Sequence, residues 1–330
     1  MALRLWRSRG SDGSSKPLRI YYASDIHGSE RLWRKFLNAA KVYEAPVIVM
    51  GGDVTGKAIV PLVEQPDGGY EMDLFGHREL LSDEEQVKDA ETRIGANGMY
   101  PHKMDYAELA AVQAMTEQER EVWFADVMLL TFERWLTLAD ERLAGTQVRC
   151  FLMPGNDDPP GVDQAIERAV RVEACDDRIV EFDGHAMISL GYSNITPFHS
   201  PRELDEDELY RRVDALASQL DDHASAVFNL HVPPYDSTLD NAAELDEDLG
   251  VVMQGSEPKI IPVGSTAVRE LIEHYQPLLS LHGHVHESAG AKRIGRTLCI
   301  NPGSDYHTGR IAGCLIAVRG SDVRHQFVTG

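Results

Sequence analysis

The stretch Ser24-Asp25-Ile26-His27-Gly28 follows directly on the apolar run at residues 18–23, which has the length and composition of a buried β-strand. In an extended segment Asp25 and His27 point to the same side, because side chains alternate along a strand. Two ligands of one metal ion would be arranged in this way. A single Asp-x-His pair is also common at solvated strand ends, so the rest of the chain has to decide between the two interpretations.

The same sequence of an apolar run followed by polar side chains recurs along the chain. The later groups are Gly51-Gly52-Asp53 after residues 46–50, Gly155-Asn156-Asp157-Asp158 after residues 148–153, His231 after residues 226–230, and His282-Gly283-His284-Val285-His286 after residues 277–281. In sheets flanked by helices, binding groups collect at the carboxyl ends of the strands. The repetition therefore predicts an α/β fold with a metal site at that edge.

Composition and charge limit the class of protein. The chain has 330 residues, of which 43% are hydrophobic and 7% aromatic, as in soluble globular proteins of one or two domains. The net charge of −21 disfavours docking on nucleic acid or on an anionic membrane, because most of the surface would repel phosphates. A small phosphoester can still bind where metal cations supply positive charge locally.

The termini and cysteines suggest a reducing compartment. Residues 1–16 are basic and rich in Ser and Gly, lack the apolar core of a signal peptide and are expected to form a flexible tail. No run approaches the ~20 apolar residues of a membrane span. The scattered cysteines are expected to be buried reduced thiols of a cytoplasmic protein with no membrane partner; they are Cys150, Cys175, Cys299 and Cys314. The oligomeric state is left open.

Local signals predict the framework around the motifs. A helix at residues 30–42, with Ser29 as its N-cap, separates the strands at 18–23 and 47–50, and a right-handed parallel crossover of this kind brings Asp25, His27 and Asp53 together. Thr116 and Glu119 form a capping box. Further helices are expected at residues 83–94, 116–143, 162–170, 203–220 and 266–275, with Ser265 capping the last, and further strands at 178–191, 293–300, 311–318 and 323–328.

Residues 55–115 differ from this alternating pattern. They contain a turn at 66–69, an alternating edge strand at 70–74 and a loop at 98–102. We interpret the segment as an insertion that overhangs the site, and a surface elaboration without a chemical role is an equal alternative.

The chemistry of the ligands indicates two ions. The candidate set combines carboxylate, amide and imidazole groups without thiolate, which suits Mn²⁺, Fe or Zn²⁺ better than a structural zinc site. It consists of Asp25, His27, Asp53, Asn156, His231, His284 and His286. Seven ligands are too many for one ion with open positions but suit two ions bridged by a carboxylate. Two ions about 3.5–4 Å apart can bind a substrate's oxygens and generate hydroxide near neutral pH.

The series Asp-x-His, Gly-Gly-Asp, Gly-Asn-x-Asp, His and Gly-His-x-His, from Asp25 to His286, resembles the calcineurin-like metallophosphoesterase superfamily. The resemblance implies a four-layer αββα sandwich over residues 17–330, with two mixed β-sheets and a dinuclear metal site at the strand carboxyl ends. It implies that a hydroxide bridging the ions attacks phosphorus, with Mn²⁺ as the expected metal and Fe, Zn²⁺ or Ni²⁺ as alternatives. By motif position, Asp25, His27 and His286 would hold the first metal, Asn156, His231 and His284 the second, and Asp53 would bridge them.

One position departs from the pattern. Many members of the family read Gly-Asn-His-Asp, where the His assists the leaving group, and this chain has Asp157 in that place. Two nearby cations would keep that carboxylate ionised, so it would be a poor proton donor at pH 7. We therefore expect a phosphodiesterase-like enzyme that handles good leaving groups or phosphodiesters, or one that takes its acid from elsewhere. Candidates for that acid are His199, His307, Tyr235 and His102.

The expected functional residues follow. Asp157, Asp53 and His199 are the candidate catalytic residues, and Asn156, His307 and Tyr235 are the candidate substrate contacts. The segment at residues 301–304 resembles a turn in bacterial and archaeal phosphodiesterase-like members, where either anion binding by backbone N–H groups or a plain turn is expected.

The sequence thus predicts a metal-dependent phosphoester hydrolase, in the first place a phosphodiesterase on a small substrate. The alternatives are a protein-binding scaffold with the same fold and a nuclease of the repair type. The complete ligand set argues against a scaffold, and the acidic surface argues against a nuclease.

Overall fold

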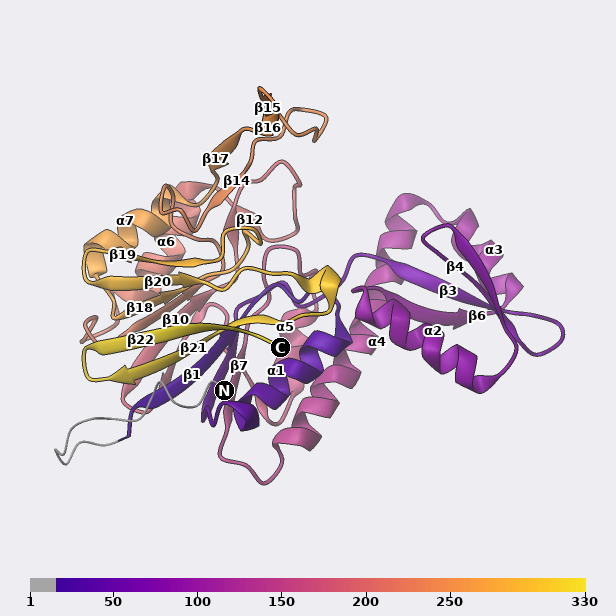
Figure 1. The fold of residues 1–330 in the computed structure, drawn as a ribbon, viewed down its shortest axis with the longest axis horizontal. Coiled ribbons are helices and arrows are strands. Elements are labelled where there is room, and N and C mark those ends of the chain that lie inside the picture. Colours follow the sequence, from indigo (N-terminus) through magenta and orange to yellow (C-terminus); the bar gives the residue numbers. More distant parts are fainter. Residues whose placement is uncertain (1–15) are drawn as a thin grey trace.

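The computed structural model describes residues 16–330 and contains two six-stranded mixed sheets packed face to face (Figure 1). The first sheet has the order β22-β21-β1-β2-β7-β8, with strands β1 Leu18–Ala23, β2 Val47–Met50, β7 Arg149–Leu152, β8 Val172–Ala174, β21 Ala312–Arg319 and β22 Asp322–Thr329. The second has the order β19-β20-β18-β13-β10-β9, with strands β9 Arg178–Phe182, β10 His185–Leu190, β13 Val227–Leu230, β18 Leu279–Leu281, β19 Gly290–Ile294 and β20 Thr297–Asn301. Residues 1–15 of the expected tail lie outside the described residues.

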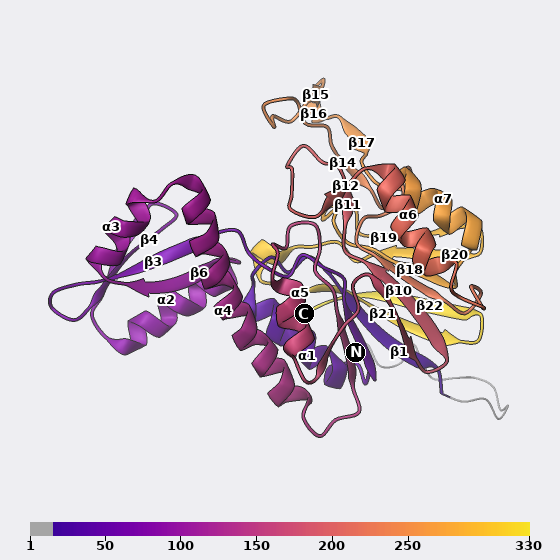
Figure 2. The same cartoon turned by 180° about the vertical axis from the view of Figure 1, so that it is seen from behind.

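Helices cover the outer face of each sheet, which gives four layers (Figures 1 and 2). Helices α1 Glu30–Val42, α4 Glu117–Leu143 and α5 Val162–Arg168 pack on the first sheet, and α6 Glu206–Ala217 and α7 Thr266–Tyr275 pack on the second. The predicted α/β fold class is confirmed. Within residues 16–330, none of the helices combines the length and the apolar character that crossing a bilayer requires.

The alternate side chains of strand β1 pack against two different layers of the fold. Tyr21 and Ala23 pack with the helices of the first outer layer, whereas Ile20 and Tyr22 pack between the two sheets. Successive side chains of a strand point to opposite faces, so a strand covered on both sides needs a continuous apolar run. This requirement explains why the strand is readable from sequence. The four cysteines are buried and free, as expected.

The segment between β2 and β7 forms a sheet of its own, which projects to the right in Figure 1. This insertion sheet has the order β5-β4-β3-β6, with strands β3 Ile59–Glu64, β4 Tyr70–Leu74, β5 His77–Leu81 and β6 Tyr100–Met104, and it is accompanied by helices α2 Glu84–Ala96 and α3 Tyr106–Ala114. It has a separate hydrophobic cluster that includes Leu62, Met72 and Ile94. That residues 55–115 are a unit added to the core stays a prediction.

Some local predictions are wrong. The strand at residues 70–74, expected at an edge, is β4, which is paired on both sides, with β3 and with β5. The loop expected at residues 98–102 is largely strand β6, where Pro101 is tolerated because β6 is the edge strand of the insertion sheet. Ser29 stands at the N-cap of α1 as expected, although its hydroxyl makes no capping hydrogen bond.

The segment between His231 and α7 contains short strands, which project at the top of Figure 1. These strands are β14 Asn241–Ala243, β15 Met253–Gln254, β16 Glu257–Pro258 and β17 Ile260–Pro262. The other short elements lie elsewhere in the chain and are β11 Ser193–Asn194, β12 Glu203–Leu204 and the 3₁₀ helix η2 Tyr306–Thr308.

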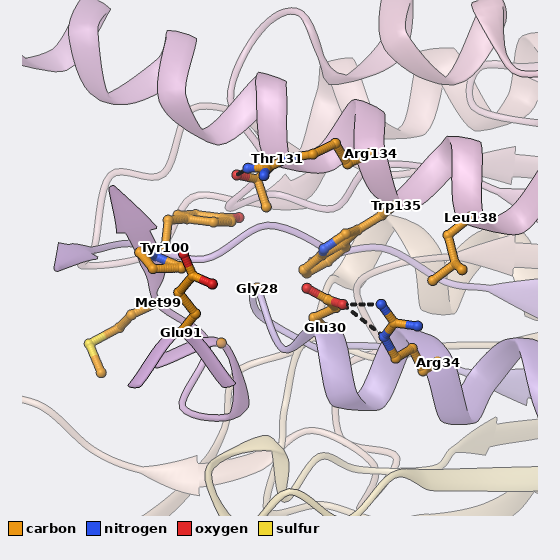
Figure 3. Close-up of a pocket in the computed structure, with 12 residues that line it drawn as sticks. Gly28, Glu30, Arg34, Glu91, Met99, Tyr100, Thr131, Arg134, Trp135 and Leu138 are labelled. Atoms are coloured by element: carbon orange, nitrogen blue, oxygen red, sulfur yellow. Dashed lines mark hydrogen bonds and ion pairs between the residues drawn. The ribbon is translucent and has the colours of Figure 1, made fainter. Parts of the chain in front are cut away.

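A cavity of about 280 Å³ lies where the insertion sheet meets α1 and α4. Figure 3 shows Tyr100 and Trp135 on opposite sides of this cavity, with the Glu30–Arg34 ion pair along one wall. Gly28, which follows the Asp-x-His motif, also lines it. The insertion therefore abuts the loop that carries the first motif.

The cap of α4 provides a test of the local folding signals. The Thr116 hydroxyl accepts from the backbone N–H of Glu119, whose carboxylate accepts from the N–H of Thr116. Thr116→Ala should lower the free energy of unfolding by about 1 kcal/mol in urea denaturation, because these end groups lose their partners. Thr137→Ala, on the exposed side of the same helix, is the control and should cause no loss, because Ala is the better helix former. Equal losses in the two variants would contradict the role of the cap.

Candidate metal centre

The predicted ligands follow the carboxyl ends of parallel strands in both sheets. Strands β1, β2 and β7 run parallel in the first sheet, and β13 and β18 run parallel in the second. The residues that follow them come together, and we call them the donor cluster: Asp25, His27, Asp53, Asn156, His231, His284 and His286. Their convergence is a feature of the structure, and their role as ligands stays a prediction.

The backbone of the cluster is not extended, which corrects one step of the sequence argument. Asp25, His27, Asp53 and His284 have φ angles of 57°, 39°, 51° and 65°. Non-glycine residues in this left-handed region cost on the order of 1–3 kcal/mol each and concentrate at functional sites. The loops are joined by hydrogen bonds from the Asp25 N–H to the Gly52 carbonyl and from the His27 N–H to the Asp53 carbonyl, each 3.0 Å. Cross-loop hydrogen bonds, rather than strand geometry, thus orient Asp25 and His27.

A first group of donors contains Asp25, His27 and His286. The Nε2 atoms of His27 and His286 are 2.9 Å apart, and Nε2 of His286 is 3.5 Å from Oδ1 of Asp25. Two imidazole nitrogens that face each other at this distance share at most one hydrogen. A cation between them would satisfy both.

A second group is built around Asn156. Its Oδ1 lies 2.7 Å from Nδ1 of His284 and 3.0 Å from Nε2 of His231. Asp53 lies between the groups, because its Oδ2 is 3.4 Å from Nε2 of His231 and 3.7 Å from Nε2 of His27. Oδ1 of Asp53 accepts a hydrogen bond of 2.9 Å from the backbone N–H of Asp157. Oδ2 is therefore the oxygen that faces both groups.

The donors fit divalent cations in spacing and in chemistry. Two ligand atoms about 2.1 Å from one ion stand about 3.0–3.4 Å apart at octahedral to tetrahedral angles. The spacings within the two groups, 2.7–3.5 Å, lie around this range. Asp25, Asp53 and His231 also form a compact group. The buried Asp and His side chains can thus hold metal ions, and the division of the ligands between two ions stays a prediction.

The charges of the cluster compensate one another. Burial would raise the pKa of Asp53, but the neighbouring His231 charge holds the pKa of this carboxyl well below its usual range. Burial opposes protonation of His231, yet Asp53 beside it raises the pKa of His231 to about 10. Burial lowers the pKa of His284 to about 4. His284 is thus the neutral imidazole that metal binding requires, while His231 has to release a proton.

Several residues hold the loops without facing the donors. The buried Asp158 carboxylate accepts hydrogen bonds from the N–H groups of Val54, Thr55 and Gly155, which ties the loop after β2 to the loop after β7. Burial raises the pKa of Asp158 to about 6. Nδ1 of the buried His282 is hydrogen-bonded to the Leu230 carbonyl oxygen, 2.8 Å away. Asp158 and His282 are therefore supports of the site.

The turn at residues 301–304 is also a support, and the anion-binding interpretation is wrong. The Gly303 N–H donates to Oδ1 of Asn301 and the Ser304 N–H donates to the His286 carbonyl, so neither is available to an anion. The Asn301 amide donates to the carbonyls of Gly283 and Val285, and the Ser304 hydroxyl donates to the Asp25 carbonyl. The turn thus fixes the loops that carry Asp25, His284 and His286.

The carboxylate of Asp157, a candidate catalytic residue, has both oxygens occupied. Oδ1 accepts a hydrogen bond of 2.6 Å from the Ser200 hydroxyl, and Oδ2 is 2.5 Å from Nζ of Lys57. The sequence analysis missed Lys57 and Ser200, because no local pattern connects them with Asp157. It also missed Tyr306, whose ring lies 4.8 Å from that of His27.

The other candidates lie in varied surroundings. His102 bonds to Glu108 at 2.8 Å and packs edge-on against Trp123, within the insertion and α4. His307 is exposed and paired with Asp305. Among the described residues, hydrogen bonds and ion pairs place none of the four candidate acids against the donor cluster; these are His102, His199, Tyr235 and His307. Their roles stay predictions.

Comparison with known proteins agrees on the fold. No family model matches the chain. The uncharacterized protein MJ1162 of Methanocaldococcus jannaschii is 30% identical over 129 residues, which cover 38% of this chain and 52% of that protein, so the chain spans about half the length of this relative. One solved structure has a TM-score of 0.55 at 14% identity and covers 94% of this chain and 98% of its own. That likeness shows a shared fold.

Two further solved structures are more distant. The protein TT1561 of Thermus thermophilus has a TM-score of 0.49 at 14% identity, over 94% of this chain and 98% of that chain. A structure described as a novel archaeal phosphodiesterase has a TM-score of 0.36 at 11% identity, over 94% of this chain and all of that chain.

The close approach of the loops at Gly155 gives a test of the cluster. A Cβ atom at Gly155 would lie 2.1 Å from Oδ1 of Asp53. Gly155→Ala should therefore displace the Asp53 carboxylate and lower the bound metal, measured by inductively coupled plasma mass spectrometry after loading with Mn²⁺. Gly95→Ala is the control, because its Cβ would meet nothing nearer than 4.0 Å and lies in α2. Full metal content in Gly155→Ala would contradict the placement of Asp53 at the centre.

Proposed function

We propose that this protein is a metal-dependent phosphoester hydrolase that acts on a small phosphodiester with two divalent cations. The observation that carries the proposal is the position of Asp53 Oδ2, 3.4 Å from His231 and 3.7 Å from His27, between two groups of donors that are mostly buried. When bound, two such cations supply a hydroxide nucleophile near neutral pH and offset the charge of the phosphoryl oxygens. Mn²⁺ is the expected metal, with Fe, Zn²⁺ and Ni²⁺ as alternatives.

Each residue has a stated task in this proposal. Asp25, His27 and His286 hold one cation, while Asn156, His231 and His284 hold the other. Asp53 would be shared by the two cations, and Oδ2 is its free oxygen, because its Oδ1 accepts a hydrogen bond from the Asp157 N–H. Asn156 also contacts the substrate, and His199, His307 and Tyr235 are candidates for the acid or for substrate contacts from the surrounding loops.

The buried charges favour an enzyme over a scaffold. Asp25 and Asp53 are 1% and 2% exposed. Burying carboxylates costs several kcal/mol per ion unless opposite charge compensates, so a protein that only binds partners gains nothing from keeping them. The net charge of −21 disfavours a nuclease, whose substrate is a polyanion.

A substrate panel tests the proposal. The full-length protein should bind two equivalents of metal and hydrolyse bis(p-nitrophenyl) phosphate when loaded with Mn²⁺, Zn²⁺, Ni²⁺ or Mg²⁺ in turn, and the rate should exceed that on p-nitrophenyl phosphate. Asp53→Asn should lower kcat on the order of 100-fold or more and reduce the metal content, because it removes the bridging charge. Asp126→Asn, at an exposed position on α4, is the matched control and should behave as the wild type.

Two results would contradict the proposal. A wild type that binds metal but hydrolyses neither ester would favour the scaffold. An Asp53→Asn variant with the rate and metal content of the wild type would show that Asp53 does not bridge two cations.

A further inference from the structure

Lys57 places a positive charge beside the donor cluster. It lies between β2 and β3, four residues after Asp53, and its Nζ is 2.5 Å from Oδ2 of Asp157. The same Oδ2 is 3.9 Å from Nδ1 of His27. Within residues 16–330, no other lysine or arginine forms an ion pair with Asp25, Asp53 or Asp157.

Asp157 is held firmly enough to position this ammonium group. The Ser200 hydroxyl donates to its Oδ1 at 2.6 Å, and its own backbone N–H donates to Oδ1 of Asp53 at 2.9 Å. The carboxylate of Asp157 is therefore fixed with respect to the bridging residue. The ion pair with Asp157 therefore also fixes the position of the Lys57 ammonium group.

The Lys57 ammonium group has N–H donors that the ion pair with Asp157 does not use. A lysine carries three N–H donors, and Asp157 occupies one face of the group. The Lys57 side chain is 65% exposed, so its other donors face solvent, whereas the Asp157 side chain is 13% exposed. Because the Lys57 side chain is mostly exposed, water screens its attraction to Asp157 and the ammonium group remains accessible to a ligand. A compact cation with free donors is suited to a phosphoryl oxygen.

The charge of Asp157 gives a second reason for a cation here. An ionised carboxylate beside the donor cluster repels an anionic ester. Lys57 neutralises it at 2.5 Å and presents positive charge on the solvent side. The pair therefore cancels the repulsion and turns its positively charged group toward solvent.

We propose that Lys57 contacts the substrate and binds a phosphoryl oxygen of the ester, and that Asp157 is the positioning residue that holds it. This inference rests on the proposed function and assigns the substrate's anionic group a protein partner in addition to the cations. It also explains why both oxygens of Asp157 are occupied.

The experiment compares the metal-loaded full-length wild type with Lys57→Gln, Lys57→Arg, Asp157→Ala and the double variant Lys57→Gln/Asp157→Ala. Lys103→Gln is the matched control, because Lys103 is also exposed and paired with a carboxylate, Glu91, at 2.9 Å in the insertion. For each protein, kcat and KM are measured with bis(p-nitrophenyl) phosphate, the binding of inorganic phosphate is measured by calorimetry, and the metal content is determined.

Lys57→Gln should lower kcat/KM on the order of 100-fold and weaken phosphate binding, with metal content and melting temperature unchanged. Lys57→Arg should recover most of the loss, and Lys103→Gln should match the wild type. Asp157→Ala should also lower kcat/KM, but the double variant should be no worse than Lys57→Gln alone, because Asp157 acts through Lys57.

Other results would overturn the inference. Lys57→Gln within twofold of the wild type in both hydrolysis and phosphate binding removes the substrate contact. If the losses in kcat/KM multiply in the double variant, or if Lys57→Gln loses metal, Asp157 does not act by positioning Lys57. If the wild type hydrolyses no ester, the proposed function fails, and phosphate binding by the wild type and Lys57→Gln alone decides the role of Lys57.

Discussion

The buried carboxylate of Asp53 is the constraint around which the rest of the structure is arranged. It is 2% exposed and has imidazole nitrogens on two sides, 3.4 Å away at His231 and 3.7 Å away at His27. A buried negative charge costs several kcal/mol unless positive charge lies beside it. The His231 imidazolium can supply that charge. Divalent cations would supply it from both sides and leave His231 free to act as a neutral ligand.

The fold meets this constraint by ending parallel strands of two sheets at one edge. Strands β1, β2 and β7 bring the first motifs, and β13 and β18 bring the last from the facing sheet. The left-handed backbone at four donors costs on the order of 1–3 kcal/mol each, and the buried hydrogen bonds of Asp158 and Asn301 offset it. Loops held by these hydrogen bonds, rather than the strands themselves, thus orient the side chains of the donor cluster.

The sequence predicts the parts of this arrangement that have local signals. Strands β1 and β2 and helices α1 and α7 have the predicted bounds, because continuous apolar runs and helical periodicity fix them. The capping box at Thr116 is present as expected. The donor cluster is readable because its motifs follow strands. What could not be read depends on contacts between distant residues: the left-handed backbone at Asp25, and the approach of Lys57 and Ser200 to Asp157.

Anomalous diffraction from crystals of the full-length protein grown with Mn²⁺ tests the central claim most directly. The account predicts two manganese peaks about 3.5–4 Å apart, on either side of Asp53 Oδ2, with the remaining donors divided between them. A single peak, or two peaks that Asp53 does not separate, would contradict it.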